Sequence, residues 1–144
     1  MKKSIVIFFL LASNVICAQT KHTNKIISKS KQLIQVIFET KDSAMLEDLF
    51  APLMIHQAGN GKVEQRQEAI SHIVNNPASY LQADMTKGYG VSKSMDSTLV
   101  KYFFKGKEVK PSASAEIYTV NLTMVWHKVK KDYKLFRLET LRIE

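Results

Sequence analysis

The chain has 144 residues, of which 45% are hydrophobic and 24% are charged. This length suits a single globular domain, and the apolar fraction, with only 5 Gly and 3 Pro, excludes a collagen-like or generally disordered chain. The 21 Lys and Arg residues outnumber the 13 Asp and Glu residues, and the net charge of +8 raises nucleic acid and anionic membranes as partners.

Residues 1–18 have the order of a secretory signal peptide. Two lysines come first, an apolar run over residues 5–12 follows, and small residues end the segment at Ala18. We expect cleavage after Ala18, which leaves a domain of residues 19–144 that is secreted or periplasmic.

Cleavage would change the composition of the folded protein. The remaining 126 residues carry a net charge of +6 and lack Cys17, the only cysteine, so thiol catalysis, disulfides and Cys-type zinc sites are excluded. Two alternatives stay open, an uncleaved anchor and acylation of Cys17, for which Ile16 and Asn14 are unusual neighbours. We expect no stable membrane anchor, because the apolar run is shorter than the about 20 residues that span a bilayer.

The first half of the domain is expected to be mainly helical. Apolar residues at helical spacing predict an amphipathic helix over residues 23–40. Asp42 is a candidate N-cap for a short second helix that Pro52 ends, and a third helix is expected over residues 67–75, before Pro77.

Strands are expected between the second and third helices and throughout the second half. Residues 53–58 and 62–64 form a predicted hairpin around the turn Gly59-Asn60-Gly61. Five further β-rich stretches, joined by short loops, predict an antiparallel meander: residues 79–85, 91–95, 98–105, 116–128 and 134–143. Helices followed by strands indicate an α+β fold in which helices cover one face of a sheet.

The last hairpin allows a prediction of register. If Lys131-Asp132 form the loop, Trp126 lies opposite Arg137 and Met124 opposite Glu139, with Leu122 and Leu141 on the same face. Each face then mixes polar and apolar residues, which favours a sheet that lines a semi-polar cavity or covers a partner subunit.

Two segments resemble a known family. Residues 50–70, FAPLMIHQAGNGKVEQRQEAI, and the final hairpin, with LTMVW at 122–126 and YKLFR at 133–137, are similar to the SnoaL-like branch of the nuclear transport factor 2-like superfamily. Two departures are the loss of a serine N-cap at Gln65 and the lysines that replace a glycine in the last hairpin.

The resemblance implies a cone-shaped, curved antiparallel sheet of the cystatin-like type, with N-terminal helices closing a pocket and a homodimer formed by the outer sheet face. The superfamily includes isomerases, polyketide cyclases, dehydratases, transport factors and members without known activity, so the fold alone leaves function open. Isomerase chemistry is disfavoured, because the few acidic candidates, Asp84, Asp96, Glu116 and Glu139, do not match the isomerase pattern.

His56 is the candidate catalytic residue. Strand alternation puts it on one face with Met54 and Ala58, where an imidazole beside a carboxylate could serve as a general base. The alternative, which the sequence favours, is a hydrogen-bonded polar residue in the pocket wall. We expect no metal site and no cofactor, because no pair among His22, His56, His72 and His127 has clear metal-ligand spacing, and His72 is expected on the outer side of its helix.

Five further residues are candidates for ligand binding, since a Trp beside an Arg could stack on a planar ligand and hold its carboxylate: Tyr80, Tyr102, Trp126, Arg137 and Glu139. The same pair could be a cross-strand contact, or Trp126 could fill the core. No nucleic acid partner is expected, because the lysine clusters do not alternate with aromatic residues.

The leading hypothesis is an exported, homodimeric domain that binds a small apolar or carboxylate-bearing ligand. The alternatives are an enzyme of the cyclase, isomerase or dehydratase type that uses His56 as its base, and a structural or protein-interaction module.

Overall fold

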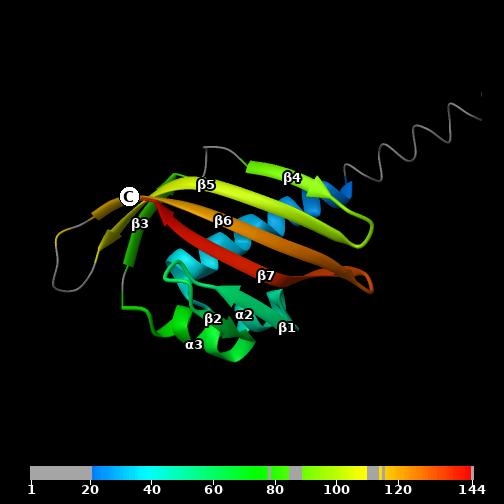
Figure 1. The fold of residues 1–144 in the computed structure, drawn as a ribbon, viewed down its shortest axis with the longest axis horizontal. Helices are drawn as coiled ribbons and strands as arrows, with labels where there is room; N and C mark the ends of the chain where they lie inside the picture. The colour runs from blue at the N-terminus through cyan, green and yellow to red at the C-terminus, as the bar shows by residue number, and fades with distance from the viewer. Residues whose placement is uncertain (1–20, 78, 85–88, 110–113, 115, 144) are drawn as a thin grey trace, which may run out of the picture.

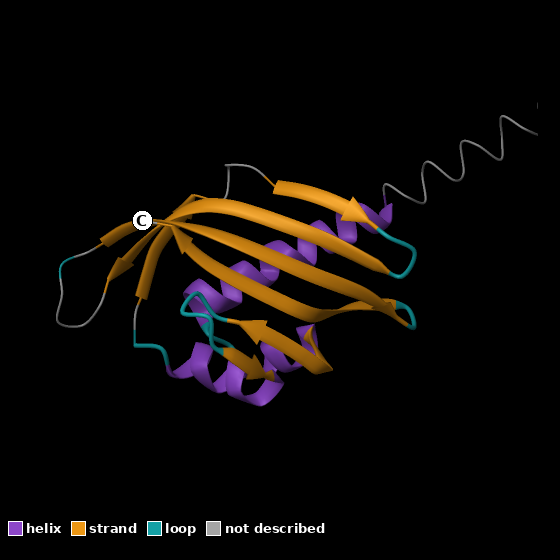
Figure 2. Ribbon diagram, viewed as in Figure 1, coloured by secondary structure: helices purple, strands orange, loops and turns teal. Residues whose placement is uncertain are grey.

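The computed structural model describes residues 21–77, 79–84, 89–109, 114 and 116–143 (Figure 1). The predicted signal peptide lies outside these residues. The α+β architecture of the described residues confirms the predicted fold class (Figure 2). A helix over residues 21–35 continues directly into the π-helical turn η1 (Val36–Thr40), and the elements that follow are α2 (Ser43–Leu49), β1 (Phe50–Gln57), β2 (Val63–Gln65), α3 (Arg66–Asn75), β3 (Ser79–Asp84), β4 (Tyr89–Lys93), β5 (Ser97–Val109), β6 (Glu116–Val129) and β7 (Asp132–Ile143).

All the strands form one sheet, but it is not the predicted meander. The strand order is β2-β1-β7-β6-β5-β3, with β4 also paired to β5. β3 pairs with the C-terminal part of β5 and β4 with its N-terminal part, because β5 continues through Gly106 where a loop was predicted. The sheet is also mixed, since β1 runs parallel to β7 while the other neighbouring pairs are antiparallel.

The start of β1 differs from the prediction. Asp42 caps α2 as expected, accepting a hydrogen bond from the backbone N–H of Met45 at 3.1 Å. The helix ends at Leu49 and β1 begins at the next residue, so Pro52 lies inside the strand. The register with β7 shifts between Phe50 and Ile55; Pro52 lies in this interval and has no N–H to donate to the neighbouring strand.

The start of α3 is held without a serine N-cap. The backbone N–H of Gln65 donates to Oε2 of Glu68 at 2.9 Å, as in a capping box. The departure at Gln65 therefore leaves the predicted helix intact, and Ala69, Ile70 and Ile73 are buried on its inner side.

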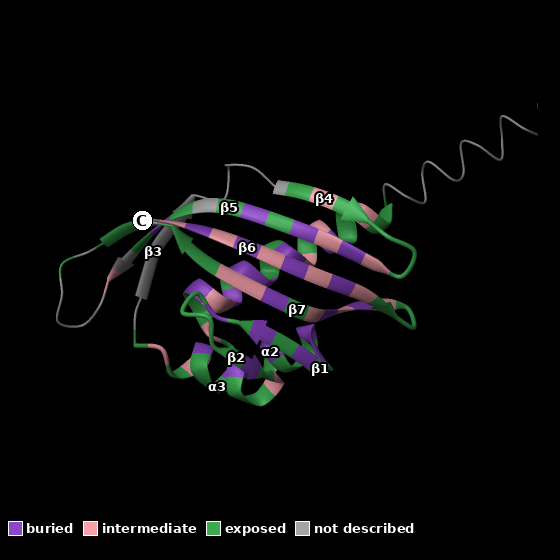
Figure 3. Ribbon diagram, in the orientation of Figure 1, coloured by how far each residue is buried: buried purple, intermediate pink, exposed green. Residues whose placement is uncertain are grey.

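The helices cover one face of the sheet. Burial alternates along β6, as Figure 3 shows, and the inner face contributes to one continuous core with the N-terminal helix, α2 and α3. The largest fully buried side chains are Trp126, Tyr102, Phe50, Ile26, Leu33, Ile34, Leu46, Leu49, Met54, Leu122 and Met124. No helix in the described part of the chain has both the length and the apolarity needed to span a membrane.

Ion pairs connect the N-terminal helix to the start of β7. Nζ of Lys29 lies 2.9 Å and Nζ of Lys25 lies 3.1 Å from the carboxylate of Asp132. Burial alone would raise the pKa of Asp132, but hydrogen bonds from Lys29, from the backbone N–H of Tyr133 and from Lys25 outweigh it and hold this pKa well below its ordinary value.

The predicted register of the last hairpin is wrong. Val129 pairs with Asp132, so the loop residues are Lys130 and Lys131, and Lys130 has a positive φ of 57°. A register shift then separates Val125, which pairs with Arg137, from Trp126, which pairs with Leu135. Such a bulge reverses which face the following residues occupy.

Consequently the predicted cross-strand pairs do not form. Trp126 points into the core, whereas Arg137 is exposed on the outer face. Met124 pairs with Leu138 instead of Glu139, and Leu122 pairs with Thr140 instead of Leu141.

Candidate functional site

A polar cluster lies where the short hairpin β1–β2 joins the edge of the long strands. The turn after Ala58 places His56 of β1 directly opposite Glu64 of β2, and on its other side His56 is the parallel neighbour of Leu138 in β7. Ala58 N–H donates to the carbonyl of Lys62 at 2.8 Å, which closes this turn. Local hairpin geometry therefore brings an imidazole and a carboxylate onto the same inner face.

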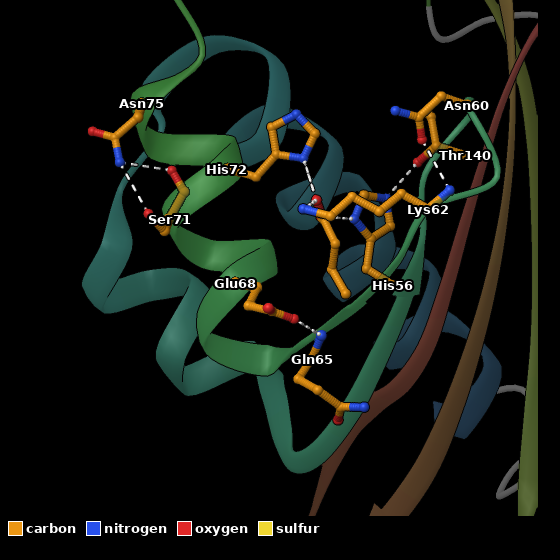
Figure 4. A network of polar contacts seen from close by, with 10 residues as sticks. His56, Asn60, Lys62, Gln65, Glu68, Ser71, His72, Asn75 and Thr140 are labelled. Atoms are coloured by element: carbon orange, nitrogen blue, oxygen red, sulfur yellow. Dashed lines mark hydrogen bonds and ion pairs between the residues drawn. The ribbon is translucent and has the colours of Figure 1, made fainter.

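The cluster is centred on the carboxylate of Glu64. Figure 4 labels the surrounding His56, Lys62, His72 and Thr140. Oε2 of Glu64 lies 3.0 Å from Nδ1 of His56, and its Oε1 lies 2.9 Å from Nδ1 of His72, which comes from α3. Nζ of Lys62 lies 3.2 Å from Oε1, and Nε2 of His56 lies 3.2 Å from Oγ1 of Thr140 in β7. Glu64 is almost fully buried, and its carboxylate forms its hydrogen bonds with these side chains.

These contacts determine the tautomer of His56. A carboxylate only accepts hydrogen bonds, so Nδ1 of His56 must carry the proton that it donates to Glu64. In the neutral ring Nε2 is then an acceptor, and the hydroxyl of Thr140 donates to it.

Charge and burial act in opposite directions on this pair. Burial lowers the pKa of His56 more than the hydrogen bond and charge of Glu64 raise it, so its pKa lies below the ordinary value. Burial would raise the pKa of Glu64, but hydrogen bonds from His72, His56 and Lys62 outweigh it, and this pKa is lowered. The pair is therefore a neutral imidazole beside an ionised carboxylate near neutral pH.

A pocket of about 130 Å³ lies beside this pair. Its walls come from η1, the end of β1, α3 and β7, and they are mainly apolar around the two imidazoles; the lining residues are Ile37, Phe38, His56, Ala58, Gly59, His72, Ile73, Asn76, Leu138 and Thr140. A dry cavity of about 150 Å³ is large enough to hold benzene. The pocket thus suits a ligand of about one ring.

Four of the predicted binding residues, Tyr102, Trp126, Arg137 and Glu139, are not among the described residues that line this pocket. Trp126 and Tyr102 are fully buried in the core, and neither lines it. Arg137 forms an ion pair with Glu139 at 2.6 Å on the outer face, and Glu139 lines a separate hollow of about 270 Å³ beside Gln57. Tyr80 lies in β3, but its side chain is outside the described part of the structure.

Four residues of the cluster, Glu64, Lys62, His72 and Thr140, were not among the candidates. Glu64 could have been found from the turn, since pairing residues 58 and 62 puts residues 56 and 64 opposite each other. His72 was expected on the outer side of α3, and its side chain is half exposed, yet Nδ1 reaches the buried carboxylate of Glu64. Thr140 has no local signal, because the parallel pairing of β1 with β7 is what brings it near His56.

The cluster also has the donor atoms of a metal site. One ligand atom each from His56, Glu64 and His72 lie within 4.8 Å of one another. Imidazole and carboxylate are the donors that transition metals such as zinc bind in proteins. The sequence predicted no such site, because the three residues lie on β1, β2 and α3, and only the folded chain brings them together.

No protein-family model and no curated protein matches the sequence. Solved structures do match it. One is a nuclear transport factor 2-like protein of unknown function in nutrient uptake from Rhodospirillum rubrum, with a TM-score of 0.70 and 19% identity over 83% of this chain and 98% of that one. Another is a candidate dehydratase of the same family from Streptomyces avermitilis, with a TM-score of 0.74 and 15% identity over 88% and 99%. The association domain of C. elegans CaMKII has a TM-score of 0.68 and 14% identity over 86% and 98%.

The chain has the nuclear transport factor 2-like fold. This confirms the fold that the resemblance implies, while membership of the superfamily and of its SnoaL-like branch remains a prediction. The neighbours include a protein of unknown function, a candidate dehydratase and an association domain, so the nuclear transport factor 2-like fold does not identify the activity. The function must be argued from the pocket and the cluster at its wall.

Proposed function

We propose that this domain binds a small, mostly apolar molecule in the pocket and anchors the ligand's single polar group on His56. The observation that carries this proposal is the arrangement of His56, whose Nδ1 is held by the buried Glu64 while its ring lines an otherwise apolar pocket. Apolar walls with one or two positioned polar groups are typical of small-molecule sites.

The hydrogen-bonding direction narrows the ligand class. Nε2 of His56 accepts a hydrogen bond from the Thr140 hydroxyl, and a ligand hydroxyl or N–H can take the place of that donor. An ionised carboxylate cannot, because it would place two acceptors against each other. Arg137, which was expected to hold a carboxylate, lies on the outer face. We therefore favour a small alcohol or phenol over the carboxylate-bearing ligand considered from the sequence.

Three ligands of similar size test this proposal: phenol, benzoate and benzene, titrated by ligand-observed NMR. We expect phenol to bind more tightly than the other two, because only phenol both fills the pocket and donates to Nε2. His56→Ala should weaken phenol binding, whereas Arg137→Ala, on the opposite face, serves as the matched control and should leave binding unchanged. Tighter binding of benzoate, or equal phenol binding in the His56→Ala variant, would contradict the proposal.

The pair His56–Glu64 favours a second function, general-base catalysis. An imidazole whose Nδ1–H is held by a carboxylate can take a proton on Nε2, and the carboxylate then stabilises the imidazolium. This is the arrangement that a cyclase, isomerase or dehydratase reaction would need, and a candidate dehydratase is among the structures with the same fold.

His56→Gln separates binding from catalysis, because the amide can still accept a hydrogen bond but cannot take up a proton near neutral pH. For a substrate found by screening, the variant should lower turnover by about 10²–10⁴-fold while changing ligand affinity much less. Unchanged turnover would refute the catalytic role and leave the binding role standing.

We further propose that the outer face of the sheet forms a homodimer. Phe103, Asn121 and Leu141 form one row across β5, β6 and β7, and Phe103, Leu141 and Ile143 are exposed there. Exposed apolar patches of this kind mark interaction sites. Light scattering after size-exclusion chromatography should give twice the monomer mass, and Phe103→Lys should shift the protein to monomer; a monomer at high concentration would refute the dimer.

Export after cleavage at Ala18 is a proposal supported by the order of charged, apolar and small residues in 1–18. N-terminal sequencing of the protein recovered from its native host should begin at Gln19. Recovery of the intact chain from the cytoplasmic fraction would contradict it.

A further inference from the structure

The carboxylate of Glu64 sits between two imidazoles that both present the same ring atom to it. Nδ1 of His56 lies 3.0 Å and Nδ1 of His72 lies 2.9 Å from a carboxylate oxygen. Both rings must hold their proton on Nδ1 in this state, since the carboxylate can only accept. A cation that replaced these two protons would meet three donor atoms that already converge.

We propose that His56, Glu64 and His72 form a binding site for a divalent transition-metal ion of the Zn²⁺ type, with two imidazole nitrogens and one carboxylate as ligands. Three protein ligands of this kind and a fourth position for water are the donor set of many zinc sites. The site does not require a ligand in the pocket.

The existing distances can be compared with those that such an ion requires. Ligand atoms at about 2.0–2.1 Å from a tetrahedral zinc are about 3.3 Å apart, so the two N···O pairs must open by about 0.3–0.4 Å. A pair at the 4.8 Å limit must close by about 1.5 Å. All three ligand atoms lie within 4.8 Å of one another. His72 can make this change, because its side chain is 49% exposed on the surface of α3.

A second hollow, broad and open, provides access for the ion. Its lining residues are Asn60, Lys62, Glu64, Gln67, Glu68, Ser71 and His72. It leaves room for a water molecule in the fourth position.

The positive charge of Lys62 opposes binding of the metal ion. Its ammonium lies 3.2 Å from Oε1 of Glu64, where it competes with any other cation for the carboxylate. The Lys62 side chain is 61% exposed, so it can turn into solvent when the ion binds. Removal of this charge should therefore strengthen metal binding, which an unrelated surface site would not show.

Metal binding would change the pocket as well. With the ion on Nδ1, the neutral ring of His56 carries its proton on Nε2, which then donates to Oγ1 of Thr140, the outer hydrogen bond that metal-bound histidines usually make. The pocket-facing atom thus changes from acceptor to donor. This consequence rests on the proposed ligand pocket, and it predicts that Zn²⁺ weakens binding of phenol and strengthens binding of cyclohexanone.

The test is a Zn²⁺ titration of the purified protein, stripped with EDTA and dialysed, against a chromophoric chelator. We expect one equivalent to bind, at least tenfold more weakly in His72→Ala and more tightly in Lys62→Met. His127→Ala, which removes a histidine outside the cluster, is the control and should bind as the unmodified protein does. ¹⁵N NMR of the imidazoles should show the proton of His56 moving from Nδ1 to Nε2 when Zn²⁺ is added.

Absence of binding at excess Zn²⁺, or equal affinity in the folded His72→Ala variant, would overturn the proposal. Weaker binding in Lys62→Met would also overturn it. Because the titration contains no pocket ligand, such a failure leaves the phenol test to decide the proposed function separately.

Discussion

Replacing Glu64 with glutamine tests whether the buried carboxylate organises the site. Glu64→Gln keeps the size of the side chain but removes the charge and puts an NH₂ group where one imidazole now donates. If the NH₂ group faces His56, this ring avoids a donor–donor contact by moving its proton to Nε2, which disturbs its hydrogen bond with Thr140. If the NH₂ group faces the other way, it meets the donors of His72 and Lys62 instead.

The magnitude follows from the burial of each partner. The side chain of Glu64 is 1% exposed and that of His56 7%, so their hydrogen bond is of the buried, charged kind, worth about 1.5–3 kcal/mol. His72 and Lys62 are half exposed or more, and each should contribute about 0.2–1 kcal/mol. We expect Glu64→Gln to lower the free energy of unfolding by about 2–5 kcal/mol, out of a typical total of about 5–15 kcal/mol.

The assay is urea unfolding at pH 8 with EDTA present, so that no bound metal contributes. Two double-mutant cycles divide the effect, one pairing Glu64→Gln with His56→Ala and the other pairing it with His72→Ala. The coupling energy should be about 1.5–3 kcal/mol for His56 and below about 1 kcal/mol for His72. An equal or larger coupling to His72, or a change below about 0.5 kcal/mol in Glu64→Gln alone, would refute the reasoning.

Three further predictions concern the rest of the fold. Trp126→Ala should cost about 3–5 kcal/mol in urea unfolding, because it empties a fully buried site, whereas Arg137→Ala should cost less than about 1 kcal/mol; similar costs would contradict their placement on opposite faces. Asp132, despite partial burial, has a lowered pKa because Lys29 hydrogen-bonds to it, so its ion pair stabilises the fold above pH about 4 and less below that pH. The unfolding free energy of Asp132→Asn should therefore be about 0.5–1 kcal/mol below that of the unmodified protein at pH 6, and this gap should shrink as pH falls below about 4; a constant gap would contradict the ion pair. Lys130→Gly should raise the unfolding free energy by about 0.5 kcal/mol, since glycine adopts the left-handed φ of 57° without strain, and a loss of stability would refute this account of the loop.

Local pattern predicted the helices and most strand positions. Periodicity located the N-terminal helix and α3, and Asp42 caps α2 as its residue type predicts. The resemblance of residues 50–70 and of the last hairpin pointed to the superfamily whose fold the structure has. The helices and the cap depend on contacts between residues close in sequence, so a local sequence pattern can predict them.

The strand partners and part of the site depend on contacts between residues far apart in the sequence, which a local pattern does not reveal. Turn residues predicted a loop at Lys131-Asp132, but the pairing of Val129 with Asp132 and the bulge after Val125 placed Trp126 inside and Arg137 outside. A one-residue change in register moves a side chain to the other face, so the bulge put Arg137 on the face opposite Trp126. The displaced loop alone would have left both residues on the same face.

Some residues of the candidate site could likewise be predicted from the sequence, and others could not. His56 was identifiable from its strand, and its carboxylate partner Glu64 follows from the turn between them, because a hairpin pairs residues at short sequence separation. Thr140 and His72 reach the cluster only through the parallel pairing of β1 with β7 and the packing of α3 on β1 and β2. The sequence thus identified His56 as a residue of interest. The chemistry of its surroundings, including the converging metal ligands, depends on tertiary contacts that bring distant segments together.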